Sequence, residues 1–133
     1  PEQWSVFNRL WGLYLNDNQV SGSLPEQWSA LSAVSWMYLS GNQLAGSLPE
    51  RWSSLSVRRM SLQNNNLTGS LPEEWSAMFS MSNLELWDNQ LTGTLPEQWS
   101  AFTRISKVDL GGNRLTGMLP EQWSALRRVV NMS

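Results

Sequence analysis

The feature of this chain that most restricts its fold is a phrase that begins with proline and recurs at a nearly constant interval. The six prolines fall at positions 1, 25, 49, 72, 96 and 120, so the intervals are 24, 24, 23, 24 and 24 residues. The phrase reads PEQWS four times, PERWS once and PEEWS once. A period of about 20 to 50 residues is the signature of a protein that stacks one structural unit along an axis. The sequence therefore predicts one solenoid domain over residues 1–133, a fragment with about five and a half copies and no caps.

The aligned copies share the pattern L-x-x-L-x-L-x-x-N-x-L-x-G-x-L-P-E-x-W-S. In one copy these positions are held by Val34, Met37, Leu39, Asn42, Leu44, Gly46, Leu48 and Pro49. This is the pattern of leucine-rich repeats. Its later part, G-x-L-P, resembles the plant-type subclass, which implies a second short strand and a 3₁₀ turn in each copy. The expected fold class is α/β: a right-handed leucine-rich-repeat solenoid (horseshoe) with a parallel β-sheet on the concave face and short 3₁₀ turns on the convex face.

The L-x-L segment of each copy is expected to form a strand of that sheet. Side chains alternate between the two faces of a strand, so in residues 13–15 and 84–86 the leucines point inward and the residue between them points outward. One copy is a residue shorter than the others, between Leu55 and Met60. This deletion falls where the convex side returns to the strand, and a loop can absorb it there without changing the strand register.

Three further residue types recur with the period and are interpreted as scaffold. The asparagine after each strand can satisfy backbone groups that have left the sheet, and a polar binding row is the alternative. A glycine permits a tight bend, and proline suits the first position of the 3₁₀ turn. The asparagines are Asn18, Asn42, Asn65, Asn89 and Asn113, and the glycines are Gly22, Gly46, Gly69, Gly93 and Gly117.

A tryptophan follows each proline by three residues. Burial of an indole removes up to about 200 Å² from water, which is worth about 5 kcal/mol at about 25 cal/mol/Å². A core position is therefore expected, and an exposed aromatic stripe that stacks on sugars is the alternative. The six tryptophans are Trp4, Trp28, Trp52, Trp75, Trp99 and Trp123.

Composition argues against several classes of function. The net charge is only -2, so neither nucleic acid nor an anionic membrane is an expected partner, and no run of about 18 apolar residues could insert into a bilayer. The chain contains no cysteine and no histidine, which removes the usual metal ligands, general base and thiol nucleophile. The glutamates recur beside the prolines, where they suit the positive end of a helical turn. We therefore expect no enzyme activity, no metal and no cofactor.

Function is instead expected at outward-facing strand positions that vary from copy to copy. Tyrosine, tryptophan and arginine dominate the energetics of many interfaces, and charged residues can form a polar flank. The alternative is that Arg59, Glu85, Lys107 and Asp109 only pair with one another on a solvated surface. The candidate ligand-binding residues are Tyr14, Trp36, Tyr38, Arg59, Glu85, Trp87, Lys107 and Asp109.

Two N-x-S/T sequons are candidate glycosylation sites if the chain is secreted. Asn66 is expected in an exposed turn, whereas Asn131 is expected on a terminal strand and is the weaker candidate. A threonine also recurs in the phrase L-T-G, at Thr68, Thr92 and Thr116. We expect these threonines in a row with cross-strand hydroxyl bonding, and a repeating ligand such as ice or a polysaccharide is the alternative.

The phrase L-P-E-x-W-S-A, preceded by N-x-L-T-G-x-L-P, resembles the repeats of trypanosomatid parasite surface antigens, namely the Leishmania surface antigen and proteophosphoglycan relatives. The resemblance implies an extracellular or cell-surface location, lipid anchoring or secretion of the parent protein, and adhesion to host molecules through a protein or glycan ligand. Two alternatives stay open. One is a plant-type receptor ectodomain fragment, and the other is a structural solenoid that associates end to end.

Overall fold

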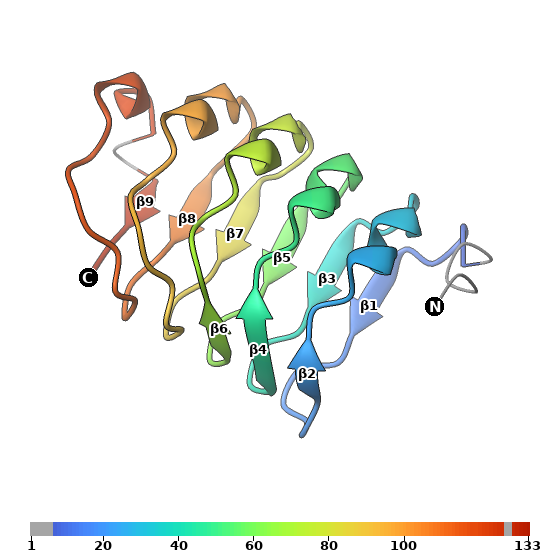
Figure 1. Cartoon of the computed structure of the whole chain (residues 1–133). Coiled ribbons are helices and arrows are strands. Elements are labelled where there is room, and N and C mark those ends of the chain that lie inside the picture. The colour runs from blue at the N-terminus through green and yellow to red at the C-terminus, as the bar shows by residue number, and fades with distance from the viewer. Residues whose placement is uncertain (1–6, 127–128) are drawn as a thin grey trace.

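The computed structural model describes residues 7–126 and 129–133, and the expected core position of Trp4 lies outside these residues. Successive copies form successive coils of a solenoid, with one main strand and one 3₁₀ turn per described copy (Figure 1). The main strands are β1 (Gly12–Tyr14), β3 (Trp36–Tyr38), β5 (Arg59–Ser61), β7 (Asn83–Glu85), β8 (Lys107–Asp109) and β9 (Val130–Asn131). The 3₁₀ turns are η2 (Glu26–Ala30), η3 (Glu50–Ser54), η4 (Glu73–Ala77), η5 (Glu97–Ala101) and η6 (Glu121–Trp123).

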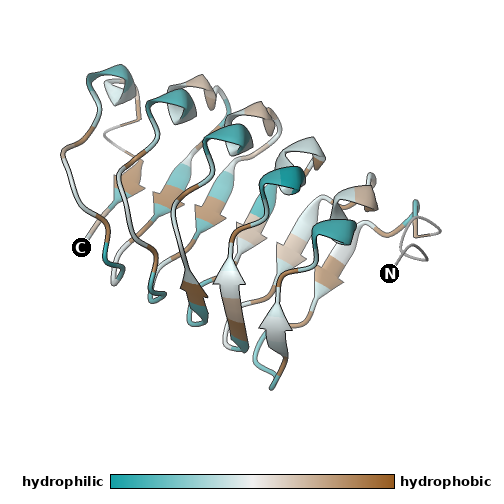
Figure 2. Cartoon of the chain, in the orientation of Figure 1, coloured by the Kyte–Doolittle hydropathy of each residue, from teal (hydrophilic) through white to brown (hydrophobic). Residues whose placement is uncertain are grey.

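The main strands form one six-stranded parallel sheet in the order β1-β3-β5-β7-β8-β9. Equivalent residues lie directly opposite one another, as in the pairing of Leu13 with Met37 and of Met60 with Leu84. The middle residue of the main strands β3, β5, β7 and β8 is buried, and its two neighbours are hydrophilic or half-buried in most of these strands (Figure 2). The predicted fold class and the inward alternation of L-x-L are therefore confirmed.

The core contains the tryptophans of the described copies. Trp52, Trp75, Trp99 and Trp123 are fully buried, and Trp28 is 6% exposed. Ring centroids lie 6.3 Å apart between Trp52 and Trp75 and 6.1 Å apart between Trp99 and Trp123, with nearly parallel planes. The Nε1–H of Trp75 donates to the carbonyl of Pro49 in the preceding coil at 2.9 Å, and Trp52, Trp99 and Trp123 make the equivalent bond. Each of these indoles thus joins two coils by stacking or packing and by a hydrogen bond, and the predicted core role is confirmed.

The asparagine ladder is also present. The Asn65 Nδ2 donates to the carbonyls of Leu39 and Leu62 at 3.0 Å each, and its Oδ1 accepts from the backbone N–H of Leu44 at 3.0 Å. The side chains of Asn42 and Asn89 are buried and make the same set of bonds. These amides satisfy backbone groups where the chain leaves the sheet, so the structural interpretation of the row is confirmed.

The prolines lie one residue before the 3₁₀ turn and not at its first position, where they were predicted. Pro25 has φ -71° and ψ 124°, which is an extended conformation, and η2 begins at the following residue, Glu26. The carbonyl of Pro25 accepts the backbone N–H of Trp28 at 3.1 Å and the indole N–H of Trp52 at 2.9 Å. Proline therefore caps the 3₁₀ turn, because its extended ψ directs this carbonyl toward both donors.

The shortened copy confirms that a loop absorbs the deletion. In the preceding copy, Leu31 has ψ 66° and the chain makes an extra turn in which the N–H of Val34 donates to the carbonyl of Leu31 at 3.2 Å. In the shortened copy the equivalent residue, Leu55, is extended with ψ 146°. The register stays intact, with Trp36 opposite Arg59.

A second parallel ladder lies on the side of the coils away from the main sheet (Figure 1) and consists of β2 (Ser21–Ser23), β4 (Gln43–Ser47) and β6 (Asn66–Thr68). This ladder is staggered by two residues per coil, so Thr68 lies opposite Ser47 and Thr92 lies opposite Ser70. The threonines therefore do not lie opposite one another in the ladder. The expected cross-strand hydroxyl bond is present at Thr116, whose hydroxyl donates to the backbone carbonyl of Gly93 in the preceding coil at 3.4 Å.

Candidate binding face

The main sheet brings the predicted contact residues onto one face in two parallel rows. The first row contains Gly12, Trp36, Arg59, Asn83 and Lys107. The second row contains Tyr14, Tyr38, Ser61, Glu85 and Asp109. The rows follow from the constant period, because strands that pair without stagger align equivalent positions of successive copies.

The aromatic patch, defined as Tyr14, Trp36 and Tyr38, occupies the β1–β3 end of this face. The rings of Tyr14 and Tyr38 stack with centroids 5.4 Å apart and planes inclined by 21°. Tyr14 is 61% exposed, while Trp36 and Tyr38 are half-buried. Gly12 makes this arrangement possible, because a Cβ at position 12 would overlap the Tyr14 ring. The patch thus presents preorganised aromatic surface to solvent.

The charged residues at the other end of the face have partners. Lys107 Nζ lies 3.4 Å from Glu85 Oε2, and the same carboxylate oxygen accepts from the Trp87 Nε1–H at 3.3 Å. The Asp109 Oδ1 accepts from the neutral Asn131 amide at 3.2 Å. The alternative interpretation of a mutually paired surface therefore describes Glu85 and Lys107, but not Asp109. Trp87 belongs to this group and not to the aromatic patch.

Arg59 differs from these charged residues. Its side chain is exposed, and within residues 7–126 and 129–133 its guanidinium makes no hydrogen bond or ion pair. Trp36 lies directly opposite Arg59 on the neighbouring strand, about 4.8 Å away across the ladder. The diagonal acid, Glu85, bonds Lys107 and Trp87 instead. Among the described residues, Arg59 is therefore the uncompensated cation of the face.

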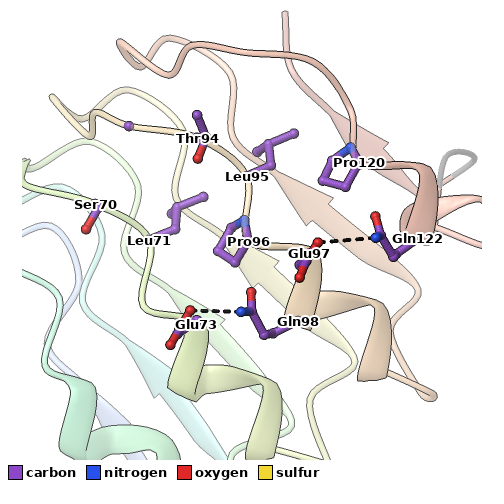
Figure 3. A pocket seen from close by; sticks show the side chains of 11 residues that line it. Ser70, Leu71, Glu73, Thr94, Leu95, Pro96, Glu97, Gln98, Pro120 and Gln122 are labelled. Atoms are coloured by element: carbon purple, nitrogen blue, oxygen red, sulfur yellow. Dashed lines mark hydrogen bonds between the residues drawn. The ribbon is translucent and has the colours of Figure 1, made fainter.

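A groove on the opposite flank was not predicted. It has a volume of about 630 Å³ and lies between the segments 70–71 and 93–96 and the 3₁₀ turns η4, η5 and η6 (Figure 3). Gln98 donates to Glu73 Oε2 at 2.9 Å, and Gln122 donates to Glu97 Oε2 at 3.2 Å, so these side chains join adjacent coils along one wall. Arg51 takes the glutamine position two coils before Gln98 and lies 3.7 Å from Glu26. In the sequence, the change from PEQ to PER and PEE was the signal for these side-chain pairs between coils. The interpretation of the glutamates as residues at the positive end of a helical turn did not use it.

The two sequons lie in different surroundings. Asn66 is exposed, but it is the first residue of β6 and not part of a turn, because it pairs in the ladder with Ala45. Asn131 lies on β9, as expected, and its amide bonds Asp109 and Ser133. Asn66 therefore offers the less engaged side chain.

No group of three or more acidic side chains within residues 7–126 and 129–133 could hold a metal ion. In the same part of the chain, no helix is long and apolar enough to cross a membrane.

Comparison with known proteins identifies the family. The leucine-rich-repeat family model matches residues 34–55, 56–78 and 104–126, which together make up just over half of the chain. A comparison with curated proteins gave no match. Among solved structures, the BIR3–SERK2 complex from Arabidopsis thaliana is 34% identical with a TM-score of 0.79, and the match covers 83% of this chain and 60% of that one.

Two further structures resemble the chain over its whole length. The plant peptide hormone receptor RGFR1 in complex with RGF2 is 27% identical with a TM-score of 0.93, over 100% of this chain and 22% of that one. A plant ice-binding protein is 28% identical with a TM-score of 0.86, over 100% and 44%. The chain thus spans less than two thirds of the length of any of the three structures. Repeat pattern, parallel coils and family match together show that the chain belongs to the leucine-rich-repeat family.

Proposed function

We propose that this chain is a protein-binding module that uses the concave face of its main sheet. The observation that carries the proposal is the aromatic patch, in which Tyr14 and Tyr38 stack beside Trp36 while keeping surface exposed. Aromatic side chains held in place on rigid strands lose little entropy on binding and are enriched in interface hot spots. The similarity to the peptide hormone receptor RGFR1 in complex with RGF2, and to the BIR3–SERK2 complex, supports a protein ligand.

The size of the face limits how strongly it can bind. Five strands about 17 Å long and about 4.8 Å apart present about 400 Å², whereas a standard interface covers about 800 Å² on each partner. We therefore propose that a tight ligand also contacts an edge of the sheet or further coils of a longer array.

The parent protein is proposed to be extracellular or at the cell surface. The resemblance of L-P-E-x-W-S-A to trypanosomatid surface antigens supports adhesion to a host protein or glycan, with lipid anchoring of the parent, and the structural neighbours support a plant-type receptor ectodomain as the alternative. We expect no catalytic activity and no cofactor.

The test is a screen of immobilised host surface proteins and glycans, repeated with a W36A/Y38A double variant. We expect the double variant to lose at least tenfold in affinity for any genuine ligand, because two of the three rings of the aromatic patch are removed. The matched control is F79A, which removes an aromatic ring that is 68% exposed and lies just after η4, away from the main sheet. Binding that survives in W36A/Y38A, or that is lost equally in F79A, would contradict the proposal.

End-to-end association of solenoids is the second candidate. The observation that supports it is that β1 and β9 each pair on one side only within the described sheet. An unpaired strand edge can pair with another chain. Light scattering over a concentration series tests this candidate, and a monomer at the highest concentration would remove it.

A further inference from the structure

We infer that the ligand of the concave face carries a carboxylate that binds Arg59, one or two residues from an apolar side chain that packs on the aromatic patch. This inference rests on the proposed function and specifies the chemistry of its ligand as an acidic segment of a protein.

The first step is the charge balance of the face. The carboxylate of Glu85 and the ammonium of Lys107 lie 3.4 Å apart, and Asp109 accepts from Asn131. These groups need no ligand to satisfy them. Arg59 is exposed and makes no such bond with any described residue, so the face offers a positive charge to an incoming ligand. Charge complementarity then selects an anion.

The guanidinium group of Arg59 is suited to binding a carboxylate. Its planar fork matches a carboxylate in a bidentate geometry, and such charge-assisted bonds are about twice as strong as neutral ones. Arg59 extends from a strand whose register is held by pairing with Trp36 on one side and Asn83 on the other. The backbone of Arg59 is therefore fixed in position, even though its side chain is free to adapt.

The third step is the position of the neighbouring surface. Trp36 lies one strand away from Arg59, about 4.8 Å across the ladder, and the Tyr14–Tyr38 stack continues the apolar surface. Residues of an extended peptide are about 3.3 Å apart along its axis. An acid and an apolar residue that are adjacent or two apart can therefore contact Arg59 and Trp36 together.

The fourth step is the asymmetry of the face beyond Arg59. On the far side lie Asn83 and then the Lys107–Glu85 pair, which offers no free cation and no exposed aromatic stack. A ligand that continued in that direction would gain polar contacts only. The acid is thus expected at one end of the contact and the apolar residues on the β1–β3 side.

The experiment selects phage-displayed random peptides on the intact chain and sequences the enriched pool. We expect enrichment of Asp or Glu next to aromatic or large aliphatic residues. An enriched acidic peptide and its amide counterpart, with Gln for Glu and Asn for Asp, are then titrated against four variants, R59Q, R59K, K107Q and W36A/Y38A.

We expect R59Q to weaken the acidic peptide by about tenfold or more and the amide peptide by less than about twofold. R59K is expected to lose part of the affinity because lysine keeps the charge but not the bidentate geometry. K107Q is the matched control, since it removes the same charge from the same row where Glu85 already compensates it. Affinity of the acidic peptide should also fall as salt is raised.

The outcomes separate the two proposals. Peptides without acids that lose binding in W36A/Y38A but not in R59Q would overturn the inference and leave the proposed function standing. No enriched peptide, or binding that W36A/Y38A does not change, would overturn both. An equal loss in R59Q and K107Q would also overturn the inference, because it would reflect general electrostatics and not a site at Arg59.

Discussion

The buried amides and indoles each serve two coils at once. Asn65 bonds backbone groups of its own coil and of the one before it, and Trp75 donates to Pro49 of the preceding coil. A single substitution at such a residue therefore breaks contacts in two coils. The same residue type in the first described coil has fewer contacts, because Asn18 is exposed and, among residues 7–126 and 129–133, its amide bonds only Leu15 and Asn16.

This difference gives a prediction about stability. The change N65A leaves the buried N–H of Leu44 and the carbonyls of Leu39 and Leu62 without the amide, at a cost of about 1 to 3 kcal/mol for each group left unsatisfied. We expect a loss of about 3 kcal/mol or more in the free energy of unfolding, against less than about 1 kcal/mol for N18A. Urea unfolding followed by tryptophan fluorescence measures both, and equal losses would contradict the ladder argument.

Asn66 carries a second prediction. Its side chain is exposed on β6, away from the main sheet, and Thr68 of the sequon is also exposed. Expressed through a eukaryotic secretory pathway, the chain should gain N-linked glycan at this site, with a mass that peptide N-glycosidase removes and N66Q abolishes.

Asn131 is the internal control for this experiment, because its amide is held by Asp109 and Ser133. We expect little modification there. A chain in which Asn131 carries glycan and Asn66 does not would contradict this interpretation of the two sites.

At the scale of elements, the strands and the return loops tolerate change differently. A strand has a strict period of two, so a deletion within it moves core side chains to the other face. A return loop has no such constraint, and the copy that contains Leu55 shows how an extended residue replaces a turn. The two kinds of element can be compared within one copy.

We expect deletion of Ala33 to be tolerated, because it makes the return loop between Leu31 and Met37 as long as the one between Leu55 and Met60. The midpoint of thermal unfolding should fall by only a few degrees. Deletion of Tyr38, within β3, should prevent cooperative folding, because it would bring Leu39 out of register with the core. Circular dichroism melts of both variants test this, and a stable Tyr38 deletion would be inconsistent with the stated register.

At the scale of the whole molecule, each coil packs only on its neighbours, so stability is a sum of coil and interface terms. Core positions in the middle coils, such as Met60 and Leu84, are fully or almost fully buried. Their counterparts toward the two ends of the described coils, including Leu13 and Val130, are only partly buried. Opening is therefore expected to begin at the ends.

Amide hydrogen exchange checks this expectation. The slowest exchange should occur in β5 and β7 and the fastest in β1 and β9, since local opening is least costly where burial is incomplete. Uniform protection of all main strands would instead indicate a single cooperative unit.

Features that follow directly from the spacing of residue types within the repeat could be predicted from the sequence alone. The spacing of leucines predicted parallel strands, the recurrence of asparagine predicted the amide ladder, and the membership of the two outward rows followed from direct alignment of copies. These features depend on residue type and spacing along one chain, and stacking then repeats them in each coil. The stagger of the second ladder and the capping role of proline were missed, because both depend on backbone angles that the pattern does not encode.

Which outward side chains are free became clear only from the folded structure. Arg59 and Lys107 occupy equivalent positions in the same row, yet Lys107 Nζ lies 3.4 Å from Glu85, whereas the guanidinium of Arg59 bonds no described residue. Likewise, Trp87 bonds Glu85 while Tyr14 stacks on Tyr38. The physical reason is that pairing depends on rotamers and on contacts between strands more than twenty residues apart, whereas the repeat pattern specifies only the strand and face on which each residue lies.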